Sequence, residues 1–435
     1  MIQVREYATL TTAPGAESSL DRGVISDATL DWLIRVGKGW KSAEPILLVE
    51  DRRSLKLGSH VGYLRSPSGE SIEILPKTGL GKDHPAVGRR VLQTMLRSAL
   101  NLQAREATAA DLLTMNTPIH EWVFAQFLHH LNGLLRRGLR FWYEDIEEES
   151  RYLRGQLMVV SQMRQPPERR HLFQVRHSVF TPDRVENRLL RTALDFVRTQ
   201  VRSAESWRLA NELSHRIDEI PPLSDPVSHL PLWQNSKLMQ PYRAVYPWCS
   251  LILERLNPNF QKGAHDGIAL LFPMEKLFER HVEVCLRASL PRGFQLSAQI
   301  GGEHLLSHRP GRSTRNEPWF QLQPDLLLRD TRTAELRVLD TKWKLIDETA
   351  ANTRDKYNIS QTDLYQLFAY GRKYLNGHGE MMLIYPKHER FNRTLPVFDF
   401  DDGLLLHAVP FCLESGRLVD SPWTLGGEPA RALSA

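Results

Sequence analysis

The chain has 435 residues, of which 41% are hydrophobic and 25% charged, so it is long enough and apolar enough for two or three globular domains. Its 56 Lys and Arg against 51 Asp and Glu give a net charge of +5, which permits nucleic-acid binding without requiring it. No apolar run approaches the roughly 20 residues of a membrane-spanning helix. The N-terminus lacks a signal-peptide pattern, so we expect a cytoplasmic protein with no membrane partner.

Residues 1–82 are predicted to form a β-rich N-terminal region. Strand-like stretches occupy Ile2–Thr12 and Ile46–Leu57. The segment Val61–Lys77 predicts a hairpin, because two apolar runs flank a Pro-Ser-Gly turn. Such a hairpin, if exposed, is our leading candidate for a partner-docking element, and a simple surface hairpin is nearly as good an interpretation. Gly79–Lys82 lacks the spacing of a phosphate-binding loop, so we expect no nucleotide site.

Residues 83–245 are predicted to be a mainly helical middle region. Apolar residues at helical spacing predict three helices, at Pro85–Leu100, Thr117–Gly138 and Asn187–Val201. The acidic run Asp145–Glu149 is expected to be a solvated face, and Met163–Arg170 a loop. An excess of Arg gives this region a basic bias, which fits either phosphate contacts or ordinary solvated side chains.

Residues 246–424 contain the sequence pattern that predicts a catalytic site. Two short runs, Leu326–Leu328 and Glu335–Lys344, predict a β-hairpin across a polar turn. In the second strand, alternation places Asp340 and Lys342 on one face. Asp325 precedes the first strand, near the same end of the hairpin. Two carboxylates and one amine are therefore expected to converge on one edge of a sheet.

Such a cluster fits a metal-dependent phosphodiesterase. Carboxylate oxygens hold Mg²⁺, and the ion neutralises phosphate charge and activates a bound water. An ammonium such as that of Lys342 orients the water or stabilises the developing charge. The alternative is a solvated salt bridge at a strand end, although charged groups at the end of apolar strands are unusual for simple packing.

Flanking elements add further candidate residues. Met274–Val282 predicts an amphipathic helix on which Glu279 is a third carboxylate or else forms a surface salt bridge with Arg280 or His281. A later helix is expected to begin at Ser360 with a capping box, and to carry Gln366 and Tyr370 one turn apart.

Two more segments complete the predicted region. A basic loop, Ser307–Asn316, lies beside the predicted site and could reach a DNA backbone. Residues 425–435 are small and polar, and are expected to form a flexible tail.

The order of these elements, with Pro324-Asp325 and Asp340-Thr341-Lys342, resembles the PD-(D/E)xK nuclease core. The spacing of Gln366 and Tyr370 is similar to that of its RecB-like branch. Further segments extend the likeness over most of the chain, which resembles the McrC family, the endonuclease subunit of McrBC-type modification-dependent restriction systems. The segments that carry this resemblance are Val61–Tyr63, Ile72–Lys77, Arg137–Leu139, Leu153–Gly155, Glu186–Arg188, Met274–Glu279, Leu339–Trp343 and Asp363–Gln366.

The resemblance implies a multidomain α+β and α/β fold, with a β-rich N-terminal region, a helical middle region and a C-terminal restriction-endonuclease-like core. It implies an Mg²⁺-dependent endonuclease that cuts double-stranded DNA carrying modified bases such as methylcytosine. The implied partner is an McrB-like AAA+ GTPase hexamer, which uses the GTP itself. Two other functions remain open: a non-catalytic activator of a ring NTPase, and a RecB-like exonuclease.

The resemblance also implies a role for each candidate residue. Asp325, Asp340 and the Thr341 carbonyl would bind Mg²⁺, with Glu279 as a possible further ligand. Lys342 would assist the attacking water or the transition state. Gln366 and Tyr370 would position Lys342, a metal-bound water or the DNA backbone.

Overall fold

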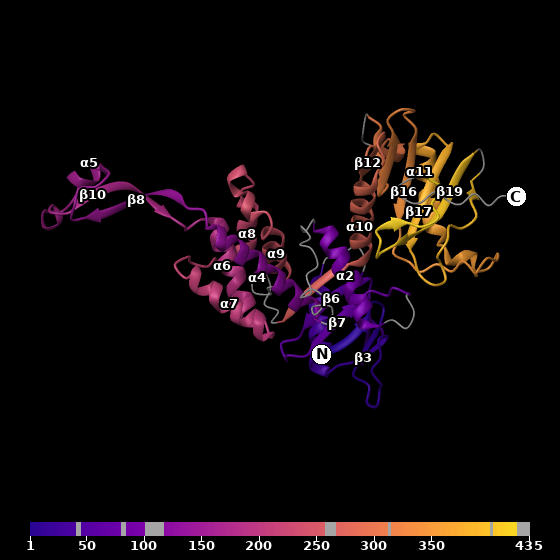
Figure 1. Ribbon diagram of the computed structural model, residues 1–435, viewed down its shortest axis with the longest axis horizontal. Coiled ribbons are helices and arrows are strands. Elements are labelled where there is room, and N and C mark those ends of the chain that lie inside the picture. The colour runs from indigo at the N-terminus through magenta and orange to yellow at the C-terminus, as the bar shows by residue number, and fades with distance from the viewer. Residues whose placement is uncertain are drawn as a thin grey trace. The chain divides into compact units, whose positions relative to one another are not determined.

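The computed structural model has helices and several sheets, and its packing divides the chain into two compact units (Figure 1). Unit 1 contains Met1–Ile119 and Leu270–Ala435, and unit 2 contains His120–Ala269. The expected regions 1–82, 83–245 and 246–424 stay predictions, because compact packing does not show which parts fold independently.

The residues that the structure describes are 1–40, 45–79, 84–100, 117–256, 267–311, 315–400 and 403–423. The predicted tail 425–435, most of Gly79–Lys82, and residues 312–314 of the basic loop lie outside them.

The N-terminal part of unit 1 is built on two sheets. The first has the order β1 (Ile2–Arg5), β7 (Ser71–Leu75), β6 (His60–Arg65) and β11 (Ile268–Pro273). The second has the order β3 (Arg22–Val24), β2 (Thr9–Thr11), β5 (Ser54–Leu57) and β4 (Leu47–Val49). Both strand-rich stretches predicted from the sequence are confirmed.

The predicted hairpin is present, but its strands are not exposed. Strands β6 and β7 pair antiparallel, with Gly62 opposite Ile74. They lie inside the sheet and are buried almost throughout, and the exposed residues of the segment 61–77 are the turn 67–69 and Lys77. Gly62 has φ +139°, and a Cβ there would lie 1.9 Å from the carbonyl oxygen of Leu270. The expectation of exposure was wrong, because β1 and β11 cover both edges of the hairpin.

Two helices complete this part of unit 1. Helix α1 (Asp27–Gly39) was not predicted; it begins at Ser26, whose side chain accepts from the amide of Thr29. Helix α2 (Pro85–Ala99) confirms the helix predicted from Pro85. A buried ion pair, 2.6 Å between Arg89 and Glu73, ties α2 to β7.

Unit 2 combines a helical core with one long hairpin. Helices α4 (Ile119–Arg137) and α6 (Val185–Gln200) confirm two predicted helices, and the remaining helices are α7 (Ala204–Arg216), α8 (Pro226–His229) and α9 (Tyr246–Leu251). Their apolar side chains pack together, with Trp122, Phe127 and Leu194 fully buried.

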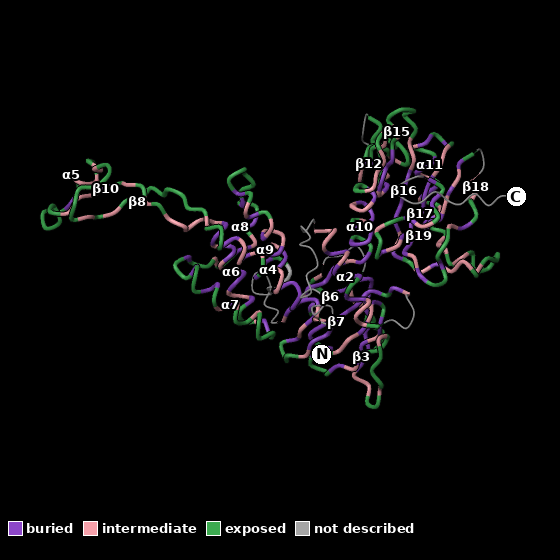
Figure 2. Tube along the Cα trace, in the orientation of Figure 1, coloured by how far each residue is buried: buried purple, intermediate pink, exposed green. Residues whose placement is uncertain are grey.

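The hairpin of unit 2 was not predicted from the sequence. Strands β8 (Trp142–Ser150) and β10 (Phe173–Thr181) pair antiparallel along their whole length, and β9 (Gln156–Leu157) and α5 (Val159–Met163) lie between them in the chain. The hairpin extends away from the helices and is mostly exposed (Figures 1 and 2). The acidic run is therefore a solvated face, as expected, but it is a face of a strand. Arg176, Arg154 and Arg169 pair with three of its carboxylates, those of Glu147, Glu148 and Glu149.

The C-terminal part of unit 1 is a seven-stranded mixed sheet. Its order is β12 (Phe294–Ala298), β15 (Leu326–Asp330), β16 (Leu336–Thr341), β17 (Gly379–Pro386), β19 (Leu404–Cys412) and β18 (Phe398–Asp399), with β20 (Arg417–Leu418) paired to β19. Strands β12, β15 and β16 are antiparallel neighbours, and β16, β17 and β19 run parallel. Helices α10 (Met274–Ser289) and α11 (Gln361–Tyr374) confirm the two helices predicted on either side of the hairpin.

A second exposed hairpin, β13 (Glu303–His308) with β14 (Glu317–Leu322), leads into the strand that follows Asp325. The predicted basic loop joins its strands. None of the helices in the described ranges is long and apolar enough to cross a membrane. The three Cys residues are free thiols.

Candidate functional site

The β15–β16 hairpin brings Asp325 and Asp340 to one end of the sheet. Leu326 lies opposite Leu339, so the residue before β15 and the last residues of β16 are neighbours. The amide and hydroxyl of Thr341 both donate to Oδ2 of Asp325, at 2.8 and 2.7 Å. The predicted hairpin is confirmed, and these two hydrogen bonds hold Asp325 against the end of β16.

Asp340 is the most deeply buried member of this cluster, with 1% of its surface exposed. The ammonium of Lys342 lies 2.7 Å from its Oδ2, as an ion pair rather than a hydrogen bond of regular geometry. Burial and the nearby charge of Asp325 raise the pKa of Asp340, and Lys342 opposes that rise. Burial also raises the pKa of Asp325, and the charge of Glu279 adds to this increase.

A chain of hydrogen bonds holds Lys342 from the side of α11. Its ammonium donates to Oε1 of Gln366 at 3.2 Å, and the amide of Gln366 donates to the hydroxyl of Tyr370 at 2.7 Å. That hydroxyl donates to the carbonyl of Gln323 at 2.9 Å, two residues before Asp325. Burial and the charge of Asp340 raise the pKa of Tyr370 to about 12, so it stays a neutral donor. Helix and hairpin are thus joined through the predicted pair.

Glu279 approaches the cluster from α10. It accepts from Nε2 of Gln299 at 2.7 Å and pairs with Lys276 at 3.0 Å. The alternative partners suggested by the sequence are engaged elsewhere: Arg280 pairs with Glu283, and His281 lies 2.8 Å from the hydroxyl of Ser98. Glu279 therefore forms an ion pair with Lys276, and its charge contributes to the raised pKa of Asp325.

The donor set fits a hard divalent cation. Within the described ranges, no group of three His, Cys, Asp or Glu side chains gathers as a ready-made metal centre. Mg²⁺ does not need one, because it keeps several waters and uses only one or two carboxylates. Asp340 is 1% exposed and Asp325 is the next carboxylate in the cluster, while Lys342 supplies one positive charge for the two, so a cation bound there would balance the remaining negative charge. Asp325, Asp340 and the Thr341 carbonyl are therefore suitable ligands.

The family comparison agrees with the resemblance read from the motifs. The model described as the McrBC 5-methylcytosine restriction system component matches residues 55–386, which is most of the chain. The chain belongs to this family. No match was found among curated protein sequences.

Solved structures show the same fold for this McrBC-family chain. One is a chain from a refined half-complex of the tetradecameric assembly of Thermococcus gammatolerans McrB AAA+ hexamers with bound McrC. It has a TM-score of 0.70 and 18% identity, and the match covers 98% of this chain and 97% of that one. A chain of the Thermococcus gammatolerans McrBC complex matches with a TM-score of 0.50 and 20% identity, over 67% of this chain and 88% of that one.

A second ion pair, not predicted from the sequence, lies beside the site of this McrBC-family chain. Lys344 pairs with Asp363 at 2.9 Å, and Asp363 is 6% exposed. The predicted capping box is wrong: Ser360 precedes α11 but makes no capping hydrogen bond through its side chain, and Asp363 is engaged by Lys344. The sequence does carry a signal for this ion pair. Lys344 lies two residues after Lys342, a spacing that places two side chains on the same face of an extended segment.

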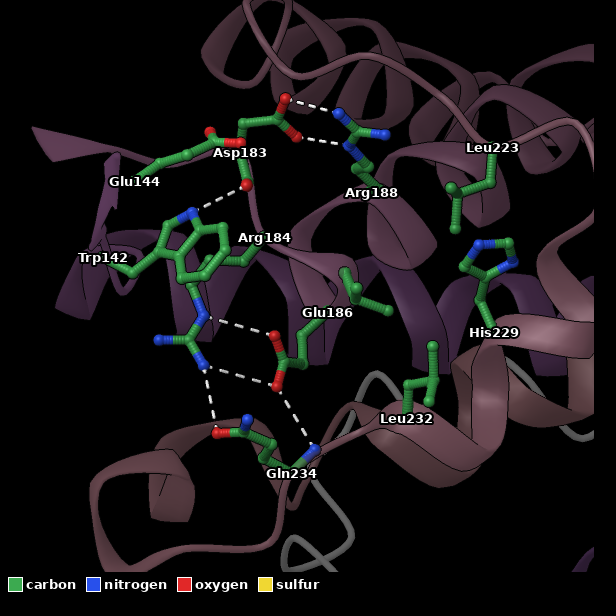
Figure 3. Close-up of a pocket in the computed structure, with 11 residues that line it drawn as sticks. Trp142, Glu144, Asp183, Arg184, Glu186, Arg188, Leu223, His229, Leu232 and Gln234 are labelled. Atoms are coloured by element: carbon green, nitrogen blue, oxygen red, sulfur yellow. Dashed lines mark hydrogen bonds and ion pairs between the residues drawn. The ribbon is translucent and has the colours of Figure 1, made fainter. Parts of the chain in front are cut away.

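A separate cavity of about 230 Å³ lies in unit 2, at the base of the long hairpin (Figure 3). Its charged groups engage one another: Arg184 pairs with Glu186, and Arg188 with Asp183. The indole of Trp142 donates to the carbonyl of Asp183 at 2.9 Å. This arrangement fixes the hairpin to α6, and we assign it no catalytic role.

Proposed function

We propose that this McrBC-family chain is the Mg²⁺-dependent DNA endonuclease subunit of a modification-dependent restriction complex, and that its C-terminal sheet is a PD-(D/E)xK core. The main support is the joint placement of Asp325, Asp340 and Lys342 at one sheet end, with the ammonium 2.7 Å from a buried carboxylate. A solvated salt bridge explains this poorly, because Asp340 is almost fully buried.

Each residue has a role in the proposed hydrolysis. Asp325, Asp340 and the Thr341 carbonyl would bind Mg²⁺, which supplies charge neutralisation at the scissile phosphate and lowers the pKa of water. Lys342 orients the attacking water and stabilises charge on the phosphate oxygens.

The remaining candidate residues position this centre. Gln366 holds the Lys342 ammonium through its Oε1, and Tyr370 holds Gln366 in turn. The negative charge of Glu279 raises the pKa of Asp325, and Glu279 is a further candidate ligand of the metal ion.

The proposed partner is an McrB-like AAA+ GTPase hexamer, because the similar solved chain comes from McrB hexamers with bound McrC. GTP would be hydrolysed by that partner. We assign the docking role to the β8–β10 hairpin rather than to 61–77, because it exposes large apolar side chains on an extended ribbon. Those side chains are Trp142, Tyr143, Tyr152, Leu153 and Phe180, exposed by 43, 70, 78, 60 and 58%.

The test uses the full chain together with its AAA+ GTPase partner. Circular plasmid, methylated or unmodified, is incubated with Mg²⁺ and either GTP or ATP. We expect linear product only from methylated plasmid, with both proteins and GTP present. A circular substrate has no ends, so cleavage excludes a pure exonuclease.

Two results would contradict the proposal. Stimulated NTP hydrolysis without any DNA cleavage would identify a non-catalytic activator. Vigorous cleavage of unmodified plasmid by the chain alone would identify a stand-alone nuclease.

A further inference from the structure

A buried carboxylate near the N-terminus reaches the strand that carries the candidate site. Glu6 follows β1 and is 1% exposed. Its Oε1 accepts from the indole nitrogen of Trp343 at 2.8 Å and from the amide of Lys77 at 2.8 Å. The amide of Glu6 donates to the carbonyl of Leu75 at 3.0 Å, so the N-terminal sheet holds the carboxylate in place. This contact joins residues 337 positions apart in the chain.

The buried position of Glu6 is energetically unfavourable for a carboxylate that only fills space. Its second oxygen, Oε2, is buried and has no hydrogen-bond partner in the described part of the chain. Burial raises the pKa of Glu6 to about 7, although the bonds from Lys77 and Trp343 oppose the shift. An apolar side chain would fill the same space without this desolvation cost. The carboxylate therefore provides something that packing alone does not, namely a directed acceptor for Trp343.

Trp343 needs such an acceptor to keep one orientation. Its ring packs against Phe278 of α10, with centroids 5.4 Å apart. It also borders a cavity of about 310 Å³, lined by Glu6, Tyr7, Lys77, Lys344, Leu345 and Pro386 as well. Because packing is incomplete on that side, the hydrogen bond to Glu6 decides where the indole lies.

The orientation of Trp343 matters because its two neighbours in the chain make ion pairs in the candidate site and beside it. Lys342 precedes it and contacts Asp340 and Gln366. Lys344 follows it and pairs with Asp363. A shift of the indole would move the backbone between these two lysines, and small displacements of a catalytic group are costly.

We propose that Glu6 is a positioning residue for the nuclease site, which acts through Trp343 to set the position of Lys342 and makes the N-terminal sheet part of the catalytic scaffold. The inference rests on the proposed endonuclease function. It requires no contact between Glu6 and DNA or metal.

The first test compares three variants in the full chain with its partner. Glu6→Ala removes the acceptor, Glu6→Gln keeps an acceptor oxygen for both donors, and Trp343→Phe keeps an aromatic ring, although a smaller one, and removes the indole N–H. We expect Glu6→Ala and Trp343→Phe to lower kcat about 10-fold with KM for DNA unchanged, and Glu6→Gln to stay within about 2-fold of wild type. The Glu6→Ala/Trp343→Phe double variant should be no slower than the worse single variant.

Glu121→Ala is the matched control. Glu121 is also a buried carboxylate; its Oε1 accepts the amide of Arg202 at 2.8 Å, and its Oε2 has no hydrogen-bond partner in the described part of unit 2. This variant should lose thermal stability but keep kcat. If Glu6→Ala and Glu121→Ala lower kcat equally at matched stability, Glu6 is only structural and the proposal is overturned.

The second test does not depend on cleavage. Hydrogen–deuterium exchange of the peptide spanning 338–347 is measured in the four single variants. Glu6→Ala and Trp343→Phe should raise exchange there, whereas Glu6→Gln and Glu121→Ala should leave it at the wild-type level. Wild-type exchange in Glu6→Ala would overturn the proposal. If the wild-type complex cuts no DNA, the endonuclease assignment fails, and exchange still decides whether Glu6 orders this strand end.

Discussion

The ammonium of Lys342 lies 2.7 Å from Oδ2 of Asp340, a carboxylate that is 1% exposed. A buried carboxylate requires a counter-charge, and Lys342 supplies a compact one. The same ammonium donates to Gln366, so its position is fixed from two sides. This geometry makes the site sensitive to the shape of the cation as well as to its charge.

Lys342→Arg should therefore nearly abolish cleavage while DNA binding stays close to wild type. The guanidinium is planar and wide, and cannot occupy the space of the ammonium between Asp340 and Gln366. We expect a loss on the order of 10²-fold in kcat, and a similar loss for Lys342→Met. Plasmid cleavage and fluorescence anisotropy of a labelled duplex measure the two properties. Lys373→Arg, on the exposed side of α11, is the control. A wild-type rate for Lys342→Arg would mean that positive charge alone is sufficient.

Asp340→Ala and Asp325→Ala should each lower the cleavage rate by about 10²–10³-fold, because each removes a proposed ligand of the ion that stabilises the transition state. Asp325→Ala should also lower the melting temperature, because Thr341 loses the acceptor for two hydrogen bonds. Partner binding should survive in both variants. Asp330→Ala, at the other end of β15, should cut normally. If Asp340→Ala or Asp325→Ala cleaves at the wild-type rate, the substituted residue is not part of the catalytic site.

The sequence predicts the parts of this site that depend on local pattern. Alternation in the predicted strand Glu335–Lys344 places Asp340 and Lys342 on one face, although β16 itself ends at Thr341, and helical spacing places Gln366 beside Tyr370. Contacts between distant segments leave no such pattern. Glu6 and Trp343 meet only because β1 and the end of β16 belong to one packed unit.

Strand β8 shows a different reason for failure. Its Glu-rich sequence has low strand propensity and reads as a solvated charge run. Cross-strand partners on β10 override that propensity, with Arg176 opposite Glu147 and Ser178 opposite Asp145. A contact with a distant residue also overrides the local pattern at Asp363. Its carboxylate pairs with Lys344 and does not take part in a capping box at Ser360.

Glu279→Gln should raise the Mg²⁺ concentration needed for half-maximal cleavage if Glu279 contributes to the metal site. The amide keeps the size of the side chain and its hydrogen bonding to Gln299, but removes the negative charge near Asp325. We expect a shift of about 10-fold, the usual size for groups that support metal ligands. Cleavage is titrated with Mg²⁺ for the wild type, Glu279→Gln and Glu283→Gln. Identical curves for the wild type and Glu279→Gln would assign Glu279 to a structural ion pair with Lys276.

Glu6 should make the stability of the protein decrease as the pH rises. Its pKa is raised from 4.5 to about 7 by burial, so the folded state holds a proton that the unfolded state has lost in this range. The free energy of unfolding therefore falls between about pH 4.5 and pH 7, by about 3 kcal/mol from this group. Glu6→Gln cannot titrate, so it should gain stability relative to wild type between pH 5 and pH 8. Urea midpoints at both pH values measure this, and a constant difference would contradict the raised pKa.

The C-terminal part of unit 1 should not be stable without the N-terminal part. Strand β11 pairs with β6, and the amide of Met274 donates to the carbonyl of Ser59 at 3.0 Å. Helix α10 packs against α2, and Trp343 donates to Glu6. A fragment of residues 267–435 would expose these apolar surfaces to water, at about 25 cal/mol per Å² of apolar area.

We therefore expect the fragment 267–435 to aggregate or to unfold at a lower temperature than the full chain, and to cut no DNA with the partner present. Co-expression with residues 1–119 should restore a soluble complex, because that segment supplies β6, α2 and Glu6 together. Size-exclusion chromatography and thermal unfolding by circular dichroism measure both outcomes. Residues 120–269 are the control, since they form the other compact unit and should not rescue the fragment. A fragment that unfolds cooperatively at the full-chain temperature would show that the N-terminal sheet is dispensable for the catalytic fold.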